Sequence, residues 1–260
     1  MITSYDCISV TGTLTSAFGT EMNRLLAAQY RPGIDSREQP LYTISEAAQY
    51  LGLQSQTLTT WLFGRFYWTK TQGRKFWEPV IAPADKDLGL LSFYNLAEAH
   101  ILAATRYRHN VSFPAVRSAI TNVVARYPIA SAHPLLSHEF YTDGKNLFIQ
   151  NLEETVDISR EQLSLKAIMD MFLERVVRDD EGNPFKVFPI VPGMAQKVVS
   201  VTFQVSSSRP VIDGTGVQVA VVWGRHQAGE EADSIAEDFD IPVEKIKMAI
   251  DYAEWKAKSA

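Results

Sequence analysis

Apolar residues recur at helical spacing in two short segments on either side of position 52. Those of the first segment are Ala47, Ala48 and Leu51, and those of the second are Leu58, Trp61 and Leu62. Ser45 and Ser55 stand where each helix would be capped, and Gly52 would end the first helix in the left-handed conformation. Two short helices around a tight turn predict a helix-turn-helix, whose second helix would lie in the major groove of DNA.

Residues 64–77 alternate bulky and polar side chains around the turn Gln72-Gly73, which predicts a β-hairpin. The segment holds four basic residues, five aromatic residues and no acidic residue. A solvated hairpin with incidental charge is one interpretation of this composition. The position directly after a helix-turn-helix favours the other, a wing that contacts phosphates.

Two longer helices follow the hairpin. Ser92 would cap one over residues 93–108, and Ser112 with Pro114 would begin another that ends at about Arg126, before Pro128. Residues 41–130 are therefore predicted to form one winged helix-turn-helix domain. Residues 1–40 are predicted to be an N-terminal arm with an amphipathic helix, whose apolar positions are Leu14, Phe18, Met22, Leu25 and Leu26.

The pattern changes in residues 131–208. Segments 139–142 and 146–150 flank Asp143-Gly144 and predict a hairpin. A long helix from Ser159 to about Arg178 would bury Leu165, Ile168, Met169, Phe172 and Val176. With extended segments at 185–191 and 198–205, this region predicts a small central antiparallel sheet with a packed helix.

The last segment, residues 209–260, begins with an extended stretch to Val219. Helices are expected over 221–227, 230–239 and 242–257, the last with Ile246, Ala249, Ile250 and Ala253 facing inward. This is a trihelical, helix-turn-helix-like unit. The predicted fold class is α+β, mainly helical.

Charge is distributed unevenly along the chain, whose formal net charge is −5. Residues 41–110 hold seven Lys or Arg and five Asp or Glu, a net of +2, whereas residues 225–258 hold five and nine, a net of −4. The terminal unit would repel phosphate and suits a basic protein partner. No apolar run approaches a membrane span, and Cys7 is the only cysteine, so a cytoplasmic protein is expected.

Polar residues at the second predicted helix and cations of the hairpin are the candidate DNA contacts. Gln54, Gln56, Thr57 and Thr60 would reach base edges, where Gln pairs with adenine and the Thr methyl touches thymine. Arg65, Lys70, Arg74 and Lys75 would contact phosphates. The recognition helix itself has no basic residue, so the hairpin must supply the charge.

Little in the sequence favours an enzyme. His133 and His138 lie near Glu139, but neither metal-ligand spacing nor a third ligand is evident. Gly214-Thr215-Gly216 lacks the glycine-lysine-serine ending of a phosphate loop. We therefore expect no catalytic residues, no metal and no cofactor.

Two segments carry a resemblance to known families. Residues 42–48 (Tyr-Thr-Ile-Ser-Glu-Ala-Ala), Leu51-Gly52 and residues 91–96 (Leu-Ser-Phe-Tyr-Asn-Leu) resemble the MerR-like winged helix-turn-helix. Residues 209–215 (Arg-Pro-Val-Ile-Asp-Gly-Thr), 235–239 (Ile-Ala-Glu-Asp-Phe) and 243–246 (Val-Glu-Lys-Ile) resemble the short C-terminal domain of VapB-type antitoxins, long classed as of unknown function. The two matches cover about half of the chain.

This resemblance implies a type II toxin–antitoxin pair. Such antitoxins inhibit a PIN-domain ribonuclease toxin, whose magnesium site is acidic, and repress their own promoter. Thr59, Thr60 and Gly216 depart from the pattern, since relatives often have arginine at these positions. We expect a homodimer. The sequence leaves open whether the N-terminal arm, the central layer or the acidic terminal unit binds the toxin. The sign of its charge favours the terminal unit, where Trp255, Lys256 and Lys258 would reach the toxin's carboxylates.

The alternative is a ligand-responsive MerR-like regulator without a toxin partner. Its sensor pocket would be lined by Phe140, Tyr141, Phe148, Phe172, Phe185 and Phe188. Such regulators dimerise through a long coiled coil, and no sustained heptad pattern follows residue 127. That absence favours the antitoxin.

Overall fold

The computed structural model describes residues 31–69, 71, 73–107, 111–127, 132–154 and 165–258. The predicted helix-turn-helix is present as α2 (Ile44–Leu51) and α3 (Ser55–Phe63), joined at Gly52 in the left-handed conformation, with φ of 62°. The predicted caps are wrong. Thr43 caps α2, because its hydroxyl and the Glu46 carboxylate reciprocally accept backbone N–H groups, and α3 starts at Ser55 without a side-chain cap.

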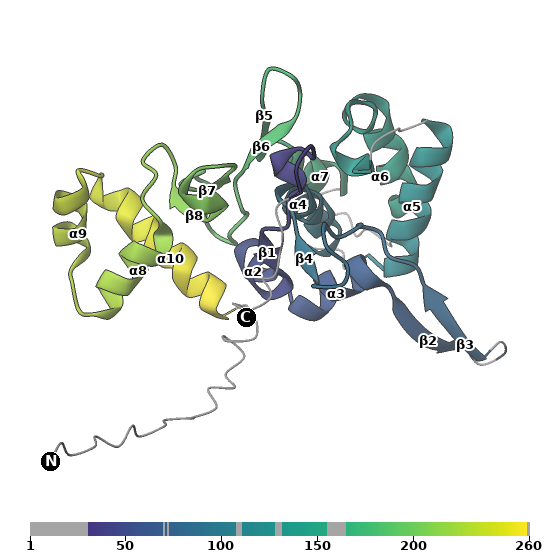
Figure 1. Cartoon of the computed structure of the whole chain (residues 1–260), viewed down its shortest axis with the longest axis horizontal. Coiled ribbons are helices and arrows are strands. Elements are labelled where there is room, and N and C mark those ends of the chain that lie inside the picture. The colour runs from purple at the N-terminus through teal and green to yellow at the C-terminus, as the bar shows by residue number, and fades with distance from the viewer. Residues whose placement is uncertain are drawn as a thin grey trace, which may run out of the picture.

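The predicted hairpin is confirmed as strands β2 (Arg65–Thr69) and β3 (Gly73–Trp77), which pair antiparallel and project away from the body of the molecule (Figure 1). We call this hairpin the wing. Short strands β1 (Tyr42–Thr43) and β4 (Leu90–Leu91) pair with each other next to α2. A 3₁₀ turn, η1 (Ser36–Glu38), precedes them.

The two longer helices are also confirmed, as α4 (Phe93–Tyr107) and α5 (Phe113–Arg126). The Ser92 and Ser112 hydroxyls accept backbone N–H groups at their starts, as predicted. Residues 93–105 of α4 are all buried, so this helix is the centre of the main hydrophobic core. The predicted N-terminal amphipathic helix lies outside the described residues.

The predicted hairpin over 139–150 is wrong. After a 3₁₀ turn, η2 (Pro134–Leu136), the chain forms a π-helical turn, η3 (Phe140–Gly144), that continues into α6 (Lys145–Glu153). A Cβ at Gly144 would lie 2.9 Å from Val123 Cγ1 on α5, so glycine permits a close approach of the two helices. Phe148 and Leu152 are thereby buried in the main core, which strand alternation would not achieve.

The long central helix is shorter than predicted within the described residues, as α7 (Leu165–Leu173), and its proposed cap Ser159 lies outside them. Val176 is not on this helix. It belongs to strand β5 (Val176–Arg178), where it pairs with Val187.

Four antiparallel strands form the central sheet in the order β5-β6-β7-β8, with β6 (Pro184–Val187), β7 (Val199–Thr202) and β8 (Pro210–Ile212). The 3₁₀ turn η4 (Ser206–Ser208) connects β7 to β8. The sheet therefore continues across the domain boundary expected at residue 208. Val201 joins the main core and Val199 joins a second core, so the sheet is shared between the two.

The second core is formed by the three C-terminal helices, α8 (Val219–Gln227), α9 (Ala232–Phe239) and α10 (Val243–Lys258), as predicted. Figure 1 shows these helices at one end of the molecule, with the end of α10 directed towards α2. The observed fold is α+β and mainly helical. Within the described residues, no helix is long and apolar enough to cross a membrane.

Candidate nucleic-acid interface

The recognition helix α3 presents only part of the predicted base-reading set to solvent. Gln54 and Gln56 are exposed and Thr57 is half-buried. Thr60 contradicts the prediction, because it is 9% exposed and its hydroxyl donates to the Gln56 carbonyl oxygen at 2.9 Å. The Thr59 hydroxyl is likewise engaged within the helix, because it donates a hydrogen bond to the Ser55 carbonyl oxygen at 2.8 Å.

A groove of about 460 Å³ lies between α3, the base of the wing, the end of α4 and the start of α5. It is lined by Gln54, Gln56, Thr57, Thr60, Trp61, Arg65, Trp77, Arg106, Val111, Ser112, Phe113, Pro114 and Val116. The lining has two arginines and no carboxylate, an environment that favours an anion. The start of α5 adds a positive helix-dipole end.

Arg106 is a residue of this groove that the sequence did not single out. It stands in the last turn of α4, and its Nη1 donates to the Val111 carbonyl oxygen at 3.1 Å. One guanidinium nitrogen thus fixes the side chain against the loop before α5. Arg106 lies about 40 residues after Arg65, and nothing in the sequence indicates that the two side chains line one groove.

The wing has two faces of different character, because alternate residues of a strand point to opposite sides. Trp77, on the inner face, stacks on Phe113 of α5 with ring centroids 5.6 Å apart, and the Arg65 guanidinium lies 5.8 Å from the Trp77 ring centroid. Tyr67 and Lys75 are cross-strand partners on this same face.

The outer face of the wing carries Phe66, Trp68, Arg74 and Phe76, according to the strand register. The predicted phosphate contacts are therefore divided: Arg65 and Lys75 lie on the inner face, and Arg74 on the outer face. All three are exposed, and Lys70 lies outside the described residues.

The C-terminal residues that we expected to meet a toxin are not a free tail. Trp255 is half-buried against the helix-turn-helix, where a Cβ on Gly52 would lie 2.0 Å from Trp255 Cζ2. Lys256 is also half-buried, with Nζ 5.7 Å from the Tyr50 ring centroid, and burial lowers its pKa. Lys258 alone of the three is exposed, with Nζ 3.5 Å from the Glu254 carboxylate.

The terminal unit and the turn η4 before it dock on β1 and α2 through a set of polar contacts. Tyr252, fully buried on α10, donates its hydroxyl to the Tyr50 carbonyl oxygen at 3.1 Å. Arg209 Nη1 lies 2.7 Å from Glu46 Oε1 and 3.1 Å from the Tyr50 hydroxyl. Tyr42 donates to the Ser208 carbonyl oxygen at 3.0 Å. We call these contacts the docking interface.

The remaining chemical candidates have structural partners. His133 Nδ1 lies 2.8 Å from the buried Glu98 carboxylate. His138 and Glu139 line an open cleft of about 670 Å³ beside His133. Across the described parts of the chain, no three His, Cys, Asp or Glu side chains gather as metal ligands would.

The aromatic residues proposed to line a sensor pocket do not share one cavity. Phe140 and Phe148 pack against each other in the main core, with ring centroids 5.7 Å apart. Tyr141 lines the cleft beside His133, whereas Phe172 lines a different cavity, of about 540 Å³, next to Trp255.

Comparison with known proteins agrees with this arrangement. The family described as "Putative DNA-binding HTH domain" matches residues 40–120, and "Protein of unknown function (DUF433)" matches residues 199–253. The protein named "Putative antitoxin VapB45" from Mycobacterium tuberculosis is 25% identical over 82% of this chain and 93% of its own length. The chain resembles a VapB-type antitoxin.

Two further similarities come from the same organism. The uncharacterized protein Rv2308 is 24% identical over 84% of this chain and 91% of its own length. The crystal structure of Rv2018 has a TM-score of 0.60 with 24% identity, over 82% of this chain and 97% of that chain, which supports the fold. The DUF433 match begins at the first residue of β7, inside the shared sheet, and not at residue 209.

Proposed function

We propose that this protein is an antitoxin that binds the promoter of its own operon and neutralises a PIN-domain ribonuclease by direct contact. It would act as a homodimer in the cytoplasm. The observation that carries the DNA-binding part is the groove between α3 and the wing, in which Gln54, Gln56 and Arg65 gather without any carboxylate. The VapB-like similarity over most of the chain supports the antitoxin part.

The groove divides DNA recognition between two kinds of side chain. Exposed Gln54 and Gln56 at the start of α3 are suited to the paired donor and acceptor of adenine in the major groove. Arg65 and Arg106 line the same groove, and Lys75 lies on the inner face of the wing. With the predicted contact of Lys70, they would bind four phosphates per subunit. With no cation on α3 itself, affinity depends on the wing and on α4.

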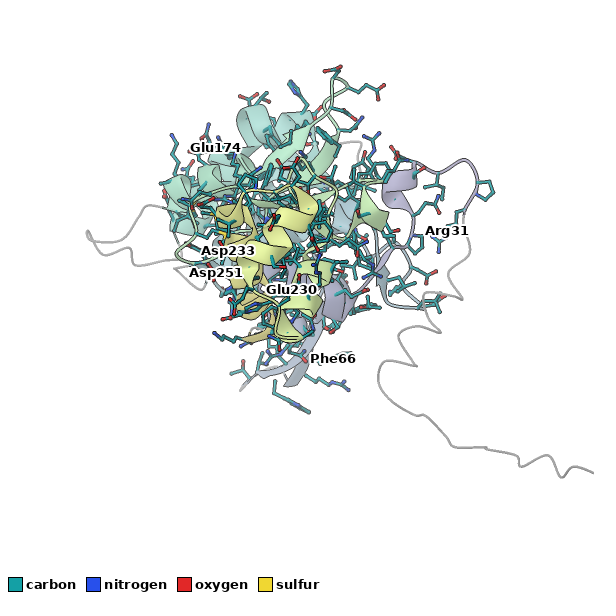
Figure 2. The ribbon with its side chains drawn as sticks, turned by 90° about the vertical axis from the view of Figure 1, so that its left-hand side faces the viewer. Arg31, Phe66, Glu174, Glu230, Asp233 and Asp251 are labelled. Carbon is teal, nitrogen blue, oxygen red and sulfur yellow. The ribbon has the colours of Figure 1, made fainter. Side chains whose placement is uncertain are left out.

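The terminal unit supports the toxin-binding part. Arg225 is already bound to Glu230 and to Asp238, so its charge is neutralised within the unit. The exposed acids Asp233 and Asp251 lie on the same side of the molecule (Figure 2). An acidic face of this kind favours a basic surface on the partner. We therefore place toxin contact on α9 and α10, and not on Trp255.

DNA binding is tested with the region upstream of the gene, by measuring affinity against salt. A dimer with about eight phosphate contacts should give a log–log slope near −7. Lys75→Ala should weaken binding to all DNA sequences alike, and it should make the slope of log affinity against log salt shallower by about 1 per subunit. Gln56→Ala should instead relax the sequence preference at one base pair. Lys247→Ala, an exposed cation on α10, is the matched control. A slope shallower than about −2 on the best site would exclude the wing as a phosphate contact.

Toxin neutralisation is tested with the neighbouring reading frame. Co-expression should rescue cells from a PIN-type ribonuclease encoded there, and the two proteins should co-purify. DNA binding without such a neighbour or rescue would instead support the alternative, a regulator without a toxin partner.

A further inference from the structure

The outer face of the wing exposes three aromatic rings together. Phe66 is 56% exposed, Trp68 79% and Phe76 40%, and the strand register places all three on one face. Figure 2 shows Phe66 on the projecting wing, away from the body of the molecule. The other large apolar residues exposed in the described part of the chain are single and scattered over other elements: Ile34, Val124, Val205 and Val221.

This aromatic face is not needed to anchor the hairpin. The inner face already holds the wing to α5 through the stacking of Trp77 on Phe113. The outer rings are ordered by each other: Phe66 and Phe76 have centroids 4.8 Å apart, and the Arg74 guanidinium lies 3.7 Å from the Phe66 centroid. A contiguous, ordered and unused apolar face on a soluble element indicates a binding surface.

The charge around the aromatic face indicates which class of partner it binds. Residues 64–77 hold four cations and no acid, so two copies meeting through their wings would bring like charges together. A nucleic acid satisfies both features, because phosphates pair with the cations while bases accept apolar contact.

The dimensions of the wing also fit DNA. A strand of five residues, such as β2, spans about 17 Å. Half of the 34 Å helical turn of B-DNA is about the same length. With α3 in the major groove, the wing would therefore reach the neighbouring minor groove. Proteins that enter the minor groove often insert apolar side chains between base steps and place arginine in the groove.

We propose that the aromatic face of the wing (Phe66, Trp68 and Phe76) enters the minor groove of the bound duplex, with Trp68 in apolar contact with a base step. This inference rests on the proposed DNA binding and specifies how the wing takes part in it. Arg74, held over Phe66, supplies the accompanying charge at the groove.

The test compares Trp68→Ala with wild type on the best promoter site. Affinity should fall roughly tenfold or more, the size of a lost base–aromatic contact. The salt slope should stay unchanged, because an apolar contact releases no counterions. Trp68→Phe should retain most of the affinity. Val221→Ala removes an apolar side chain that is 47% exposed on the terminal unit, and it is the control.

A second readout uses 2-aminopurine placed at single steps of the minor groove flanking the recognition-helix site. Its fluorescence should rise on binding wild type and not on binding Trp68→Ala at saturating protein. Equal affinity and equal fluorescence for the two proteins would overturn the inference while leaving DNA binding intact. A shallower slope in Trp68→Ala would overturn it in favour of a phosphate contact.

Sedimentation tests the other possible partner of the aromatic face, which is a second copy of this chain. If Trp68→Ala is monomeric where wild type is dimeric, the face binds a second copy, and the inference is wrong. If wild type binds no promoter DNA at any salt concentration, the proposed function fails, and the inference fails with it. Circular dichroism of each variant establishes that the wing substitution leaves the fold intact.

Discussion

Two core histidines, His100 and His133, have pKa values that their surroundings shift in opposite directions. His100 is fully buried on α4 with its Nε2–H donating to the Phe172 carbonyl oxygen at 3.0 Å, and burial lowers its pKa to about 4. Burial also disfavours the charged form of His133, but the hydrogen bond to the Glu98 carboxylate overcomes this and raises its pKa. Folding therefore disfavours the charged form of His100 and favours the charged form of His133.

The free energy of unfolding should depend on pH in two adjoining ranges, one set by each histidine. Because the pKa of His100 falls from 6.5 to about 4 on folding, its contribution is lost as pH falls from about 6.5 towards 4, by about 3 kcal/mol in all. His133 stabilises most below its unfolded pKa, and its contribution is lost as pH rises above about 6.5 through the raised value.

Urea unfolding of His100→Gln and His133→Gln across this pH range measures each window separately. The loss of stability on the acid side should be absent in His100→Gln. Burial raises the pKa of Glu98, so His133→Gln should still lose stability as pH rises, and should do so from a lower pH than wild type. Identical pH profiles in wild type and both variants would contradict these pKa directions.

At the scale of elements, the turn of the helix-turn-helix depends on a contact from the other end of the chain. Gly52 has φ of 62°, which other residues adopt at a cost, and the Trp255 ring occupies the space beside it. Local strain and a tertiary clash therefore both oppose a side chain at this position. The two effects are separable by substitution.

Gly52→Ala should destabilise the protein by more than the roughly 1–2 kcal/mol of left-handed backbone strain. In a Trp255→Ala background the added cost of Gly52→Ala should fall to that strain alone, because the clash is removed. Gly182→Ala is the matched control, since its φ is +84° and nothing lies within 4 Å of the added Cβ. Equal costs of Gly52→Ala in both backgrounds, by urea denaturation, would show that Trp255 does not pack on the turn in solution.

On the scale of the whole molecule, the DNA-binding domain and the acidic terminal unit are joined by both a shared sheet and the docking interface. The docking contacts fall on α2, through Tyr50 and Glu46, and the contact of Trp255 falls on the turn that leads to the recognition helix. A substitution at the docking interface therefore lies next to the helix-turn-helix that we propose to bind DNA.

Arg209→Glu should weaken docking, because it places a second carboxylate against Glu46 where a 2.7 Å ion pair stood. We expect greater quenching of Trp255 fluorescence by acrylamide, measured in a variant that retains Trp255 as its only tryptophan near the interface, and a Tm lower by a few degrees. Lys247→Glu makes the same change of charge at an exposed site on α10 and should leave both unchanged. No difference between the two variants would mean that Arg209 does not hold the units together.

Sequence alone determined the elements that depend on short-range interactions. The helical stripes of α2, α3, α4, α5 and α10 and the alternation of the wing are local patterns, so their types and approximate limits followed directly. The exposure of Gln54 and Gln56 followed from the same helical geometry. The prediction for Thr60 was wrong because helical spacing does not show that its side chain is buried with its hydroxyl bonded to the Gln56 carbonyl oxygen.

Only the tertiary structure decided features that join distant segments. Residues 140–153 are helical because Gly144 lets them pack closely on Val123 of α5, although Asp-Gly favours a hairpin turn locally. Arg106 joins Arg65 at the groove, and Trp255 covers Gly52, through contacts between residues far apart in the chain. Periodicity records which face of an element is apolar. It does not record which other element packs on that face. In this protein the packing between distant elements forms both the groove and the docking interface.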